Sequence, residues 1–336
     1  MSARHTSKRR GGGGEDALVA WLRRTLGSPA RELIGDDAAM VRLSGEWALT
    51  VDSQIEGTHF RSGLDPAVIA RRLLAVNVSD LAAVGAVPVY GLLALSTPAG
   101  FDHRRFFRAL AAAAKSLGVT LAGGDIARAP VVVASLTLLG RRRGARWLRR
   151  DVARPGDSLW VGGTLGESAL GRLLLERGAS WRNGRVELPA DLALDAAASR
   201  AARAAVKRHL APRPQLAVSK ELAGGRRCAC IDVSDGLGRD LARLAAASGV
   251  GATVDAEALQ LPRDATRLAM ALGAQPLQLA LGGGEDYVLL FTLPGRATAP
   301  EGCVRIGEVE RRLGLRLRRC GRVEELAASG WDHLLL

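Results

Sequence analysis

The feature that most constrains this chain is a series of acidic residues, each beside an apolar run or a glycine. They occur from one end of the sequence to the other, at Gly35-Asp36-Asp37, Asp52, Ser79-Asp80, Gly123-Gly124-Asp125, Asp232-Val233-Ser234-Asp235-Gly236 and Gly282-Gly283-Gly284-Glu285-Asp286. Isolated buried carboxylates are costly, so several that are brought together need cations. Hard oxygen ligands select Mg²⁺ or Ca²⁺, and neighbouring glycines let the backbone approach phosphates closely. The pattern predicts a site in which several Mg²⁺ ions hold a polyphosphate.

The length and charge of the chain narrow the classes of protein that could carry such a site. Its 336 residues suffice for two domains of ordinary size. The formal net charge is +13, and arginine supplies nearly all of the positive side chains, which favours anionic ligands such as nucleotides and phosphates. Because the arginines are scattered and not interleaved with aromatic residues, a nucleic-acid partner is disfavoured.

The remaining composition is typical of a cytoplasmic enzyme. No long uncharged apolar run predicts a membrane span. The four cysteines form no CxxC pair and lie near no histidine cluster, so zinc ligation is not expected. Residues 1–14 are basic and Gly-rich and lack the apolar region of a signal peptide, so we expect a disordered basic tail there.

Hydrophobic periodicity, caps and turns predict alternating helices and strands. Helices are expected at 15–26, 66–85, 102–117, from Gly166 through Arg177, and at 192–209, 215–224, 236–249 and 263–272. Strands are expected at 37–42, 47–52, 89–96, 119–122, 131–140, 158–161, 228–232, 252–255 and 287–293, with edge strands at 303–309 and 313–318 and a loop at 178–190. The order lacks a regular βαβ period, so we expect an α+β fold.

Two of the acidic motifs point beyond ordinary turns and caps when taken alone. Asn77, Ser79 and Asp80 lie within a predicted apolar helix, although all three are poor helix formers, so they need polar partners. Three consecutive glycines at 282–284 lose much backbone entropy on ordering, which favours a ligand contact. The other motifs, taken singly, are equally compatible with turns or helix caps.

Taken together, the motifs resemble those of the thiamine-monophosphate kinases, in the superfamily of aminoimidazole ribonucleotide synthetase. The matching segments are 34–39, 75–83, Gly123-Gly124-Asp125, 232–237, Gly283-Gly284-Glu285-Asp286-Tyr287 and Gly330-Trp331-Asp332-His333. They occur in the same order from about Glu15 to His333, which is essentially the whole chain. Asn-x-Ser-Asp and Gly-Gly-Asp are shared across the superfamily, whereas the last two segments are more specific to the kinase.

The resemblance implies an architecture and a reaction. The architecture has an N-terminal sheet domain at 15–150, which binds ATP and Mg²⁺ and forms a homodimer, and a C-terminal α/β-like domain at 151–336. A turn at 154–157 and a change of composition after it place the boundary near Asp151. The implied reaction transfers the γ-phosphate of ATP, the co-substrate, to thiamine monophosphate, with several Mg²⁺ ions bound.

The resemblance also implies roles for individual residues. The implied metal ligands are Asp37, Thr50, Val51, Asp52, Asp80, Asp125, Asp232 and Asp235. The implied ATP contacts are Gly124, Asp125, Arg150 and Ser234. The implied contacts to thiamine phosphate are His59, Glu285 and Trp331. Val51 stands where the family usually has Thr, Trp331 replaces the usual Tyr, and Ile126-Ala127 replaces a more polar pair.

No general base is expected for this reaction. A phosphate monoester has a second pKa of about 6, so its oxygen is already a deprotonated nucleophile near neutral pH. The chain has to bring two polyanions together in line, and neither a Ser-His nor a Cys-His pair stands out in the sequence.

Two other classes stay open at this point. One is a different ATP-dependent enzyme of the superfamily, aminoimidazole ribonucleotide synthetase or a selenophosphate synthetase. The latter normally has a reactive cysteine or selenocysteine near its N-terminus, and this chain has no cysteine before Cys228. The other is a non-catalytic nucleotide-binding protein, against which the full set of carboxylates argues. Turnover of ATP with thiamine monophosphate discriminates among the three.

Overall fold

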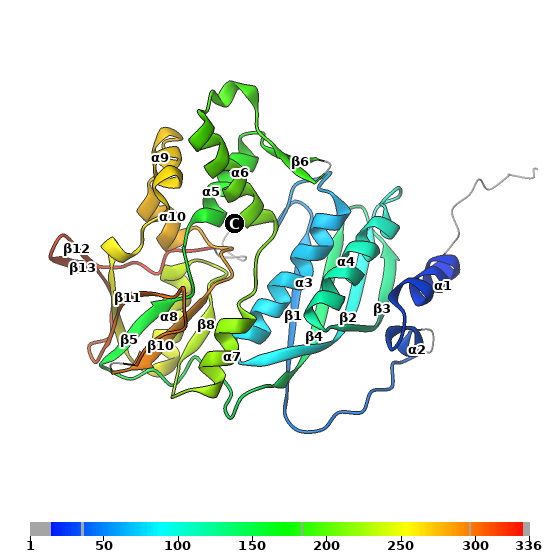
Figure 1. Cartoon of the computed structure of the whole chain (residues 1–336), viewed down its shortest axis with the longest axis horizontal. Helices are drawn as coiled ribbons and strands as arrows, with labels where there is room; N and C mark the ends of the chain where they lie inside the picture. The colour runs from blue at the N-terminus through cyan, green and yellow to red at the C-terminus, as the bar shows by residue number, and fades with distance from the viewer. Residues whose placement is uncertain (1–14, 35–36, 183, 296, 332–336) are drawn as a thin grey trace, which may run out of the picture.

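The chain folds into two domains that lie side by side (Figure 1). A computed structural model describes residues 15–34, 37–182, 184–295 and 297–331, so the expected basic tail at 1–14 lies outside the described residues. Each domain has its own sheet with helices packed on it. The predicted α+β, two-domain architecture is confirmed. In the described part of the chain, no helix is long and apolar enough to cross a bilayer.

The N-terminal domain consists of a four-stranded sheet and helices on one of its faces. Its helices are α1 (Glu15–Leu26), α2 (Ala30–Leu33), α3 (Pro66–Ala83) and α4 (His103–Leu117), and its strands are β1 (Trp47–Ile55), β2 (Ala86–Thr97), β3 (Thr120–Arg128) and β4 (Val133–Arg142). The strand order is β1-β4-β2-β3, and only β2 and β3 run parallel. Leu93, Leu95, Leu136 and Leu138 pack beneath α3 and α4, whereas Leu49, Val51 and Leu92 leave the opposite face apolar and exposed.

Helix α3 carries most of the polar groups that matter below. Asp65 caps it by accepting a hydrogen bond of 2.9 Å from the Ala67 N–H, and Pro66 suits its first turn. The helix is buried on nearly every side because it packs on the sheet and also contacts strand β8 of the other domain. Its polar side chains therefore face protein or the cleft between the domains.

The C-terminal domain consists of a seven-stranded sheet, a small hairpin and two layers of helices. Its strands are β5 (Asp157–Val161), β6 (Ser180–Arg182), β7 (Arg185–Glu187), β8 (Cys230–Asp232), β9 (Gly251–Asp255), β10 (Leu289–Pro294), β11 (Val304–Glu310), β12 (Gly314–Arg319) and β13 (Arg322–Glu325). Its α-helices are α5 (Glu167–Glu176), α6 (Ala196–Leu210), α7 (Leu216–Gly224), α8 (Leu237–Ser248), α9 (Arg263–Ala271) and α10 (Pro276–Gly282), with 3₁₀ turns η1 (Ala190–Leu192) and η2 (Ala256–Ala258).

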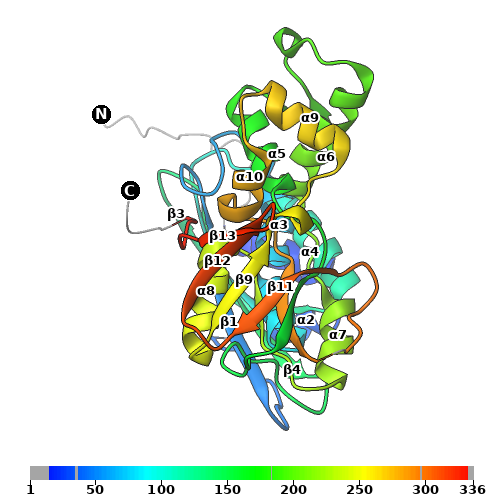
Figure 2. The same ribbon diagram turned by 90° about the vertical axis from the view of Figure 1, so that its left-hand side faces the viewer.

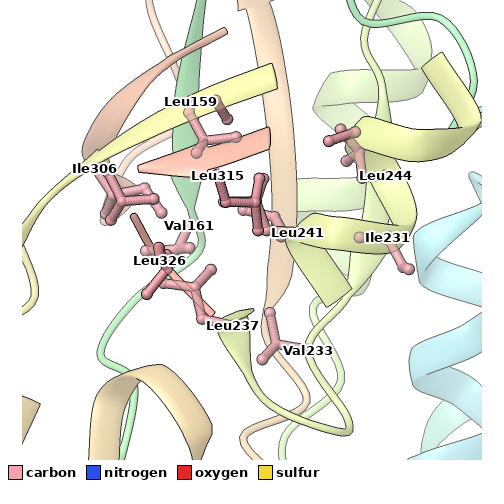
Figure 3. Close-up of a cluster of buried hydrophobic side chains, with 14 of the residues drawn as sticks. Leu159, Val161, Ile231, Val233, Leu237, Leu241, Leu244, Ile306, Leu315 and Leu326 are labelled. Atoms are coloured by element: carbon pink, nitrogen blue, oxygen red, sulfur yellow. The ribbon is translucent and has the colours of Figure 1, made fainter. Parts of the chain in front are cut away.

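The larger sheet has the order β13-β12-β9-β11-β5-β10-β8. Figure 2 shows β9, β11, β12 and β13 of this sheet facing the viewer, with α5, α6, α9 and α10 gathered beyond one end. The core lies between the sheet and α8, where Leu237, Leu241 and Leu244 meet apolar side chains of the strands (Figure 3). Strand β8 is the edge that contacts α3, so the sheet ends where the N-terminal domain begins.

Several predicted elements were wrong. Residues 37–42 form no strand: β1 pairs only with β4 and is the edge of its sheet, and Met40 in this segment is 82% exposed, so the segment buries too little apolar surface to add a strand there. Strand β11 is not an edge strand but pairs with both β5 and β9, and β12 lies between β9 and β13. The predicted loop at 178–190 contains the β6–β7 hairpin. The sequence analysis also missed α2, α10 and β13.

Candidate active site

A cavity of about 590 Å³ opens between the two domains. The N-terminal domain lines it with residues of β1 and the following loop, and the C-terminal domain with three separate loops and α5. Its lining residues are Asp52, Ser53, Gln54, Thr58, His59, Arg172, Glu176, Ser234, Asp235, Gly282, Gly283, Gly284, Glu285, Tyr287, Gly330 and Trp331. Six predicted site residues from distant parts of the chain thus share one cavity: Asp52, His59, Ser234, Asp235, Glu285 and Trp331.

Hydrogen bonds place the carboxylates of α3 and its neighbours. Thr50 Oγ1 donates to Asp80 Oδ2 at 2.5 Å, and Ser79 Oγ donates to Asp232 Oδ2 at 2.7 Å. Asn77 Oδ1 accepts from the Asp52 N–H at 2.9 Å. The mid-helix polar residues therefore have the polar partners that the sequence indicated, and α3 binds to both β1 and β8 through them.

Burial raises the pKa of these carboxyl groups. Burial, with the charges of Asp80 and Asp235, raises the pKa of Asp52 to about 7. Burial and then the charge of Asp80 raise the pKa of Asp232 to about 8, against the hydrogen bond from Ser79. Burial also raises the pKa of Asp80, although Thr50 and Arg150 act in the opposite sense. These groups lie close enough to repel one another when ionised.

The donor set fits divalent metal ions that are shared with a phosphate ligand. Bound cations would offset the cost of burying the charges of Asp52, Asp80 and Asp232 and would reduce the repulsion among them. Within the described ranges, no three carboxylate, imidazole or thiol groups converge into a complete metal cage. That arrangement suits Mg²⁺, which is commonly held by one or two carboxylates together with substrate phosphates and water.

The opposite side of the cavity is built from two loops of the C-terminal domain. The Glu285 N–H donates to Ser234 O at 2.6 Å, and the Trp331 N–H donates to Asp235 O at 2.9 Å. Glu285 has φ of 58°, a conformation that non-glycine residues seldom adopt, so its carboxylate is placed at a cost in backbone energy. Both loops are thus fixed to the segment that carries Ser234 and Asp235.

Gly124 and Asp125 do not join these residues within one chain. Asp52 pairs with Leu136, Leu136 with Leu93, and Leu93 with Gly124, so the whole width of the sheet separates β1 from β3. Three strand spacings amount to roughly 14 Å. Asp125 is exposed, and both residues line a separate small cavity of about 110 Å³ between β3 and the first two helices.

Gly124 shows why that position lacks a side chain. Its φ is +154°, and a Cβ there would lie 1.9 Å from Leu93 O of the neighbouring strand. Only glycine lets β3 keep this close approach. Asp37 is exposed in the irregular segment before β1, and Ile34, which precedes it, lines the same small cavity. Gly124, Asp125 and Asp37 therefore lie outside the cleft cavity.

Val51 and Arg150, two further predicted site residues, both lie outside the cavity lining. Val51 is 61% exposed on the open face of the sheet, because side chains alternate along β1 and its neighbours Thr50 and Asp52 point toward α3. Only the backbone of Val51 could serve a ligand on the α3 side. Arg150 is exposed in the segment between the domains, and its charge acts on Asp80.

A buried polar group beside the cavity was not predicted from the sequence. It consists of Gln54, which lines the cavity, and of Arg72 and His209 behind it, all at most 5% exposed, and it contacts Glu285. Burial, together with the charge of Arg72, lowers the pKa of His209 to about 3, so His209 is neutral and its contact with Glu285 is not an ion pair. The available signal was a pair of arginines, Arg71 and Arg72, between apolar residues of α3.

Comparisons with known proteins agree with this geometry. Residues 35–141 match the family model "AIR synthase related protein, N-terminal domain", and residues 154–318 match the corresponding C-terminal domain. The thiamine-monophosphate kinase of Salmonella typhimurium is 34% identical over 316 residues, covering 89% of this chain and 91% of the relative. That of Aquifex aeolicus is 32% identical, covering 95% and 98%.

A solved structure is similar along the same length. It is described as "AaThiL complexed with AMPPCP and TMP", is 32% identical in sequence, and covers 95% of this chain and 97% of its own. Its TM-score to the present structure is 0.74. The likeness therefore includes both domains and the cleft between them.

Proposed function

This chain belongs to the thiamine-monophosphate kinases of the AIR synthase related family, and from that membership we propose its reaction: the γ-phosphate of ATP is transferred to the phosphate of thiamine monophosphate, giving thiamine diphosphate and ADP. The observation that carries the proposal is the cleft cavity, whose wall carries the carboxylates of Asp52 and Asp235 together with Glu285 and Trp331. A related structure binds AMPPCP, a methylene analogue of ATP, together with TMP.

We assign the carboxylate side of the cavity to the phosphates and to several Mg²⁺ ions. When bound, Mg²⁺ would neutralise the phosphate oxygens and the developing charge of the transfer. Asp232 supplies a buried carboxylate for it and Asp52 and Asp80 half-buried ones, with Asp235 at the cavity wall and the Thr50 hydroxyl on Asp80.

Two further groups are assigned to ATP. The Ser234 N–H donates to Asp240 Oδ2 at 3.0 Å, which fixes the backbone of the residue whose hydroxyl we assign to ATP. Arg150 adds a positive charge near Asp80.

The chain itself needs no base for this reaction. The acceptor phosphate loses its second proton at about pH 6, so it enters the site as a nucleophile. What the residues contribute is position, because in-line transfer between two polyanions depends on orientation and on compensation of charge. The convergence of β1, α3 and β8 on one cleft provides that position.

We assign the opposite side of the cavity to the thiamine rings. The thiazolium ring is cationic, so the Glu285 carboxylate offers it an opposite charge and the Trp331 indole a π face. Burial alone would raise the pKa of Glu285, but the charge of Arg72 is the largest influence that holds it below its usual range. Glu285 is therefore ionised at neutral pH. His59 lines the same cavity.

We further propose that the active protein is a homodimer whose chains meet through the N-terminal sheets. Leu49, Val51 and Leu92 are 68%, 61% and 41% exposed on the face that no helix of the domain covers. The same arrangement accounts for Asp125. Within one chain, the full width of the sheet separates Asp125 from Asp52, so a single chain does not bring them together. In the dimer, Gly124 and Asp125 of one protomer serve the cleft of its partner.

The reaction is placed in the cytoplasm. ATP is a cytoplasmic metabolite, and all four cysteines of the chain are free thiols, which suits a reducing compartment.

The test of the proposed function is turnover by the purified chain. ATP and thiamine monophosphate are supplied with and without Mg²⁺, and thiamine diphosphate and ADP are quantified together. Equal amounts of both products, formed only with Mg²⁺, are the expected result. ADP formed without thiamine diphosphate would contradict the assignment of the acceptor. Free thiamine serves as the control acceptor, since it lacks the nucleophilic phosphate.

A further inference from the structure

Arg72 is the largest fully buried side chain of the described structure and lies behind the cavity without lining it. It projects from α3 and is 1% exposed. Its three guanidinium nitrogens donate to three different chain segments: Nε to Gln54 Oε1 at 2.8 Å, Nη1 to the His209 carbonyl oxygen and Nη2 to Glu285 Oε1. One side chain therefore joins β1, α6 and the glycine-rich loop, which belong to both domains.

Glu285 is the member of this group that reaches the cavity. Its side chain is 23% exposed, whereas that of Arg72 is 1% exposed. Glu285 Oε1 contacts Arg72, and Glu285 Oε2 lies 3.3 Å from His209 Nδ1. Arg72 thus holds Oε1 from behind and the neutral His209 ring lies beside Oε2, so buried neighbours limit how the carboxylate can turn toward the cavity.

The backbone around Glu285 needs such support. Glu285 and Tyr287 both have positive φ, 58° and 50°. Asp286 between them is buried, and its carboxylate accepts from the Gly166 N–H at 2.8 Å. Strained non-glycine residues persist where the surrounding structure over-determines them, and they concentrate at ligand sites. Through Arg72, the N-terminal domain helps to hold this strained loop in place.

We propose that Arg72 is a positioning residue for the acceptor substrate, acting through Glu285 to hold its carboxylate toward the thiamine rings. The inference rests on the proposed function of the same cavity. It differs from a purely structural role because the fork of Arg72 ends on Glu285, whose carboxylate also lines the cavity. Arginine suits the position because its planar fork meets several acceptors at once, which lysine cannot do.

The experiment is steady-state kinetics on Arg72→Met and Arg72→Lys, with the two KM values measured separately. In Arg72→Met we expect the KM for thiamine monophosphate to rise about tenfold or more, and the KM for ATP to change by less than about twofold. In Arg72→Lys the rise should be smaller, because the charge is kept but not the fork. Arg227→Met is the matched control, since Arg227 pairs with the buried Asp157 away from the cavity.

A double-mutant cycle separates positioning through Glu285 from an independent effect. If Arg72 acts through Glu285, adding Arg72→Met to Glu285→Gln should raise the KM for thiamine monophosphate by less than about twofold further. If the KM for thiamine monophosphate in the double variant rises by the product of the two single effects, the inference is overturned. Equal rises in the KM values for ATP and for thiamine monophosphate in Arg72→Met would overturn it as well. If Arg72→Met does not fold, an unchanged KM in Arg72→Lys overturns it as well.

The wild-type assay separates this inference from the proposed function. If the wild-type chain does not phosphorylate thiamine monophosphate, the proposed function fails, and the inference fails with it. If the wild-type chain is active and Arg72→Met keeps the wild-type KM for thiamine monophosphate, only the inference fails.

Discussion

Ser79 and Asp232, which are 153 positions apart in the sequence, are joined by a buried hydrogen bond of 2.7 Å from the serine hydroxyl to the carboxylate. Ser79 belongs to α3 of the N-terminal domain and Asp232 to β8, the edge strand of the C-terminal sheet. The next residue of α3, Asp80, accepts from Thr50 of β1. One turn of α3 therefore connects both sheets to the carboxylate cluster, and the two domains build the phosphate side of the cleft together.

Asp80→Asn should remove most of the activity without unfolding the protein. The amide keeps an oxygen that can accept from Thr50 Oγ1, but it loses the charge that a metal ion needs. We expect kcat/KM to fall on the order of a thousandfold, because a bound metal contributes several kcal/mol of charge stabilisation. Turnover is measured over a range of Mg²⁺ concentrations, and thermal unfolding reports on the fold.

Asp157→Asn is the control for this prediction. Asp157 is also buried, at 3% exposed, but it pairs with Arg227 and does not line the cavity. It should lower stability and leave kcat/KM near the wild-type value. If Asp80→Asn kept near-wild-type activity at low Mg²⁺, its assignment as a metal ligand would be wrong.

Mixed dimers test whether a second chain supplies Asp125. Asp125→Asn alone should be inactive for the same reason as Asp80→Asn. If each site takes Asp80 from one chain and Asp125 from the other, a heterodimer of the two variants contains one intact site. Random mixing should then restore about one quarter of the wild-type activity, because half of the dimers are mixed and each has one working site.

The outcome that would contradict this arrangement is a purified heterodimer without activity. A strict monomer in light scattering at micromolar concentration would contradict the dimer itself. Leu49→Lys should weaken the dimer, because it places a charge on the exposed apolar face.

The starts of two helices were predictable from the sequence because they follow a local rule. Asp65 caps the helix that was predicted to begin at Pro66, and Asp102, predicted as the first residue of the next helix, caps it. Asn77 and Ser79 are poor helix formers within an apolar helix, and this conflict indicated that they have polar partners. The structure shows Asp52 and Asp232 as those partners.

The role of Arg72 was not predictable in the same way. Its partners Glu285 and His209 lie 213 and 137 positions away, and no local pattern carries information over that distance. The predicted edge strand at 303–309 failed for a related reason. A charged, alternating sequence resembles an exposed edge, but a Cβ at Gly307 would lie 2.0 Å from Thr253 O, so the glycine admits a second neighbouring strand.

His209 predicts a specific sensitivity to acid. Burial and the charge of Arg72 lower the pKa of His209 from 6.5 to about 3, with Arg172 acting in the same sense and Glu285 in the opposite one. Between those values the unfolded chain binds a proton at His209 that the folded chain does not, so the contribution of His209 to stability falls as the pH decreases through that range. The slope is about 1.4 kcal/mol per pH unit, which gives up to about 2 kcal/mol between pH 6.5 and 5.

Urea unfolding of the ligand-free protein at these two pH values measures the effect. His209→Gln removes the titrating group, so the variant should lose less stability than the wild type over the same interval. The carboxylate of Glu285, whose pKa is held low, stays ionised throughout this range and does not mask the difference. Equal losses in the two proteins would show that His209 is not buried as a neutral group.

Replacing Trp331 should affect the KM values for the two substrates differently. Its indole lines the cavity and is 40% exposed, while its backbone N–H is held by Asp235 O at 2.9 Å. Gly330 lies so close to the Asp235 carbonyl that a Cβ there would be 2.5 Å from the oxygen. The backbone of this segment is thus fixed to the loop that carries Asp235, which holds the indole at the cavity wall, where we expect it to stack on a thiamine ring.

Trp331→Ala should therefore raise the KM for thiamine monophosphate several-fold to some tens-fold, with a small effect on the KM for ATP. A cation stacked on tryptophan contributes roughly 0.5–2 kcal/mol, which corresponds to that range. Trp331→Tyr should restore most of the loss, because tyrosine keeps a π face and is the usual residue of the family. Steady-state kinetics on both variants decides between stacking and a role in anchoring the chain. Anchoring would instead raise both KM values together and lower the melting temperature.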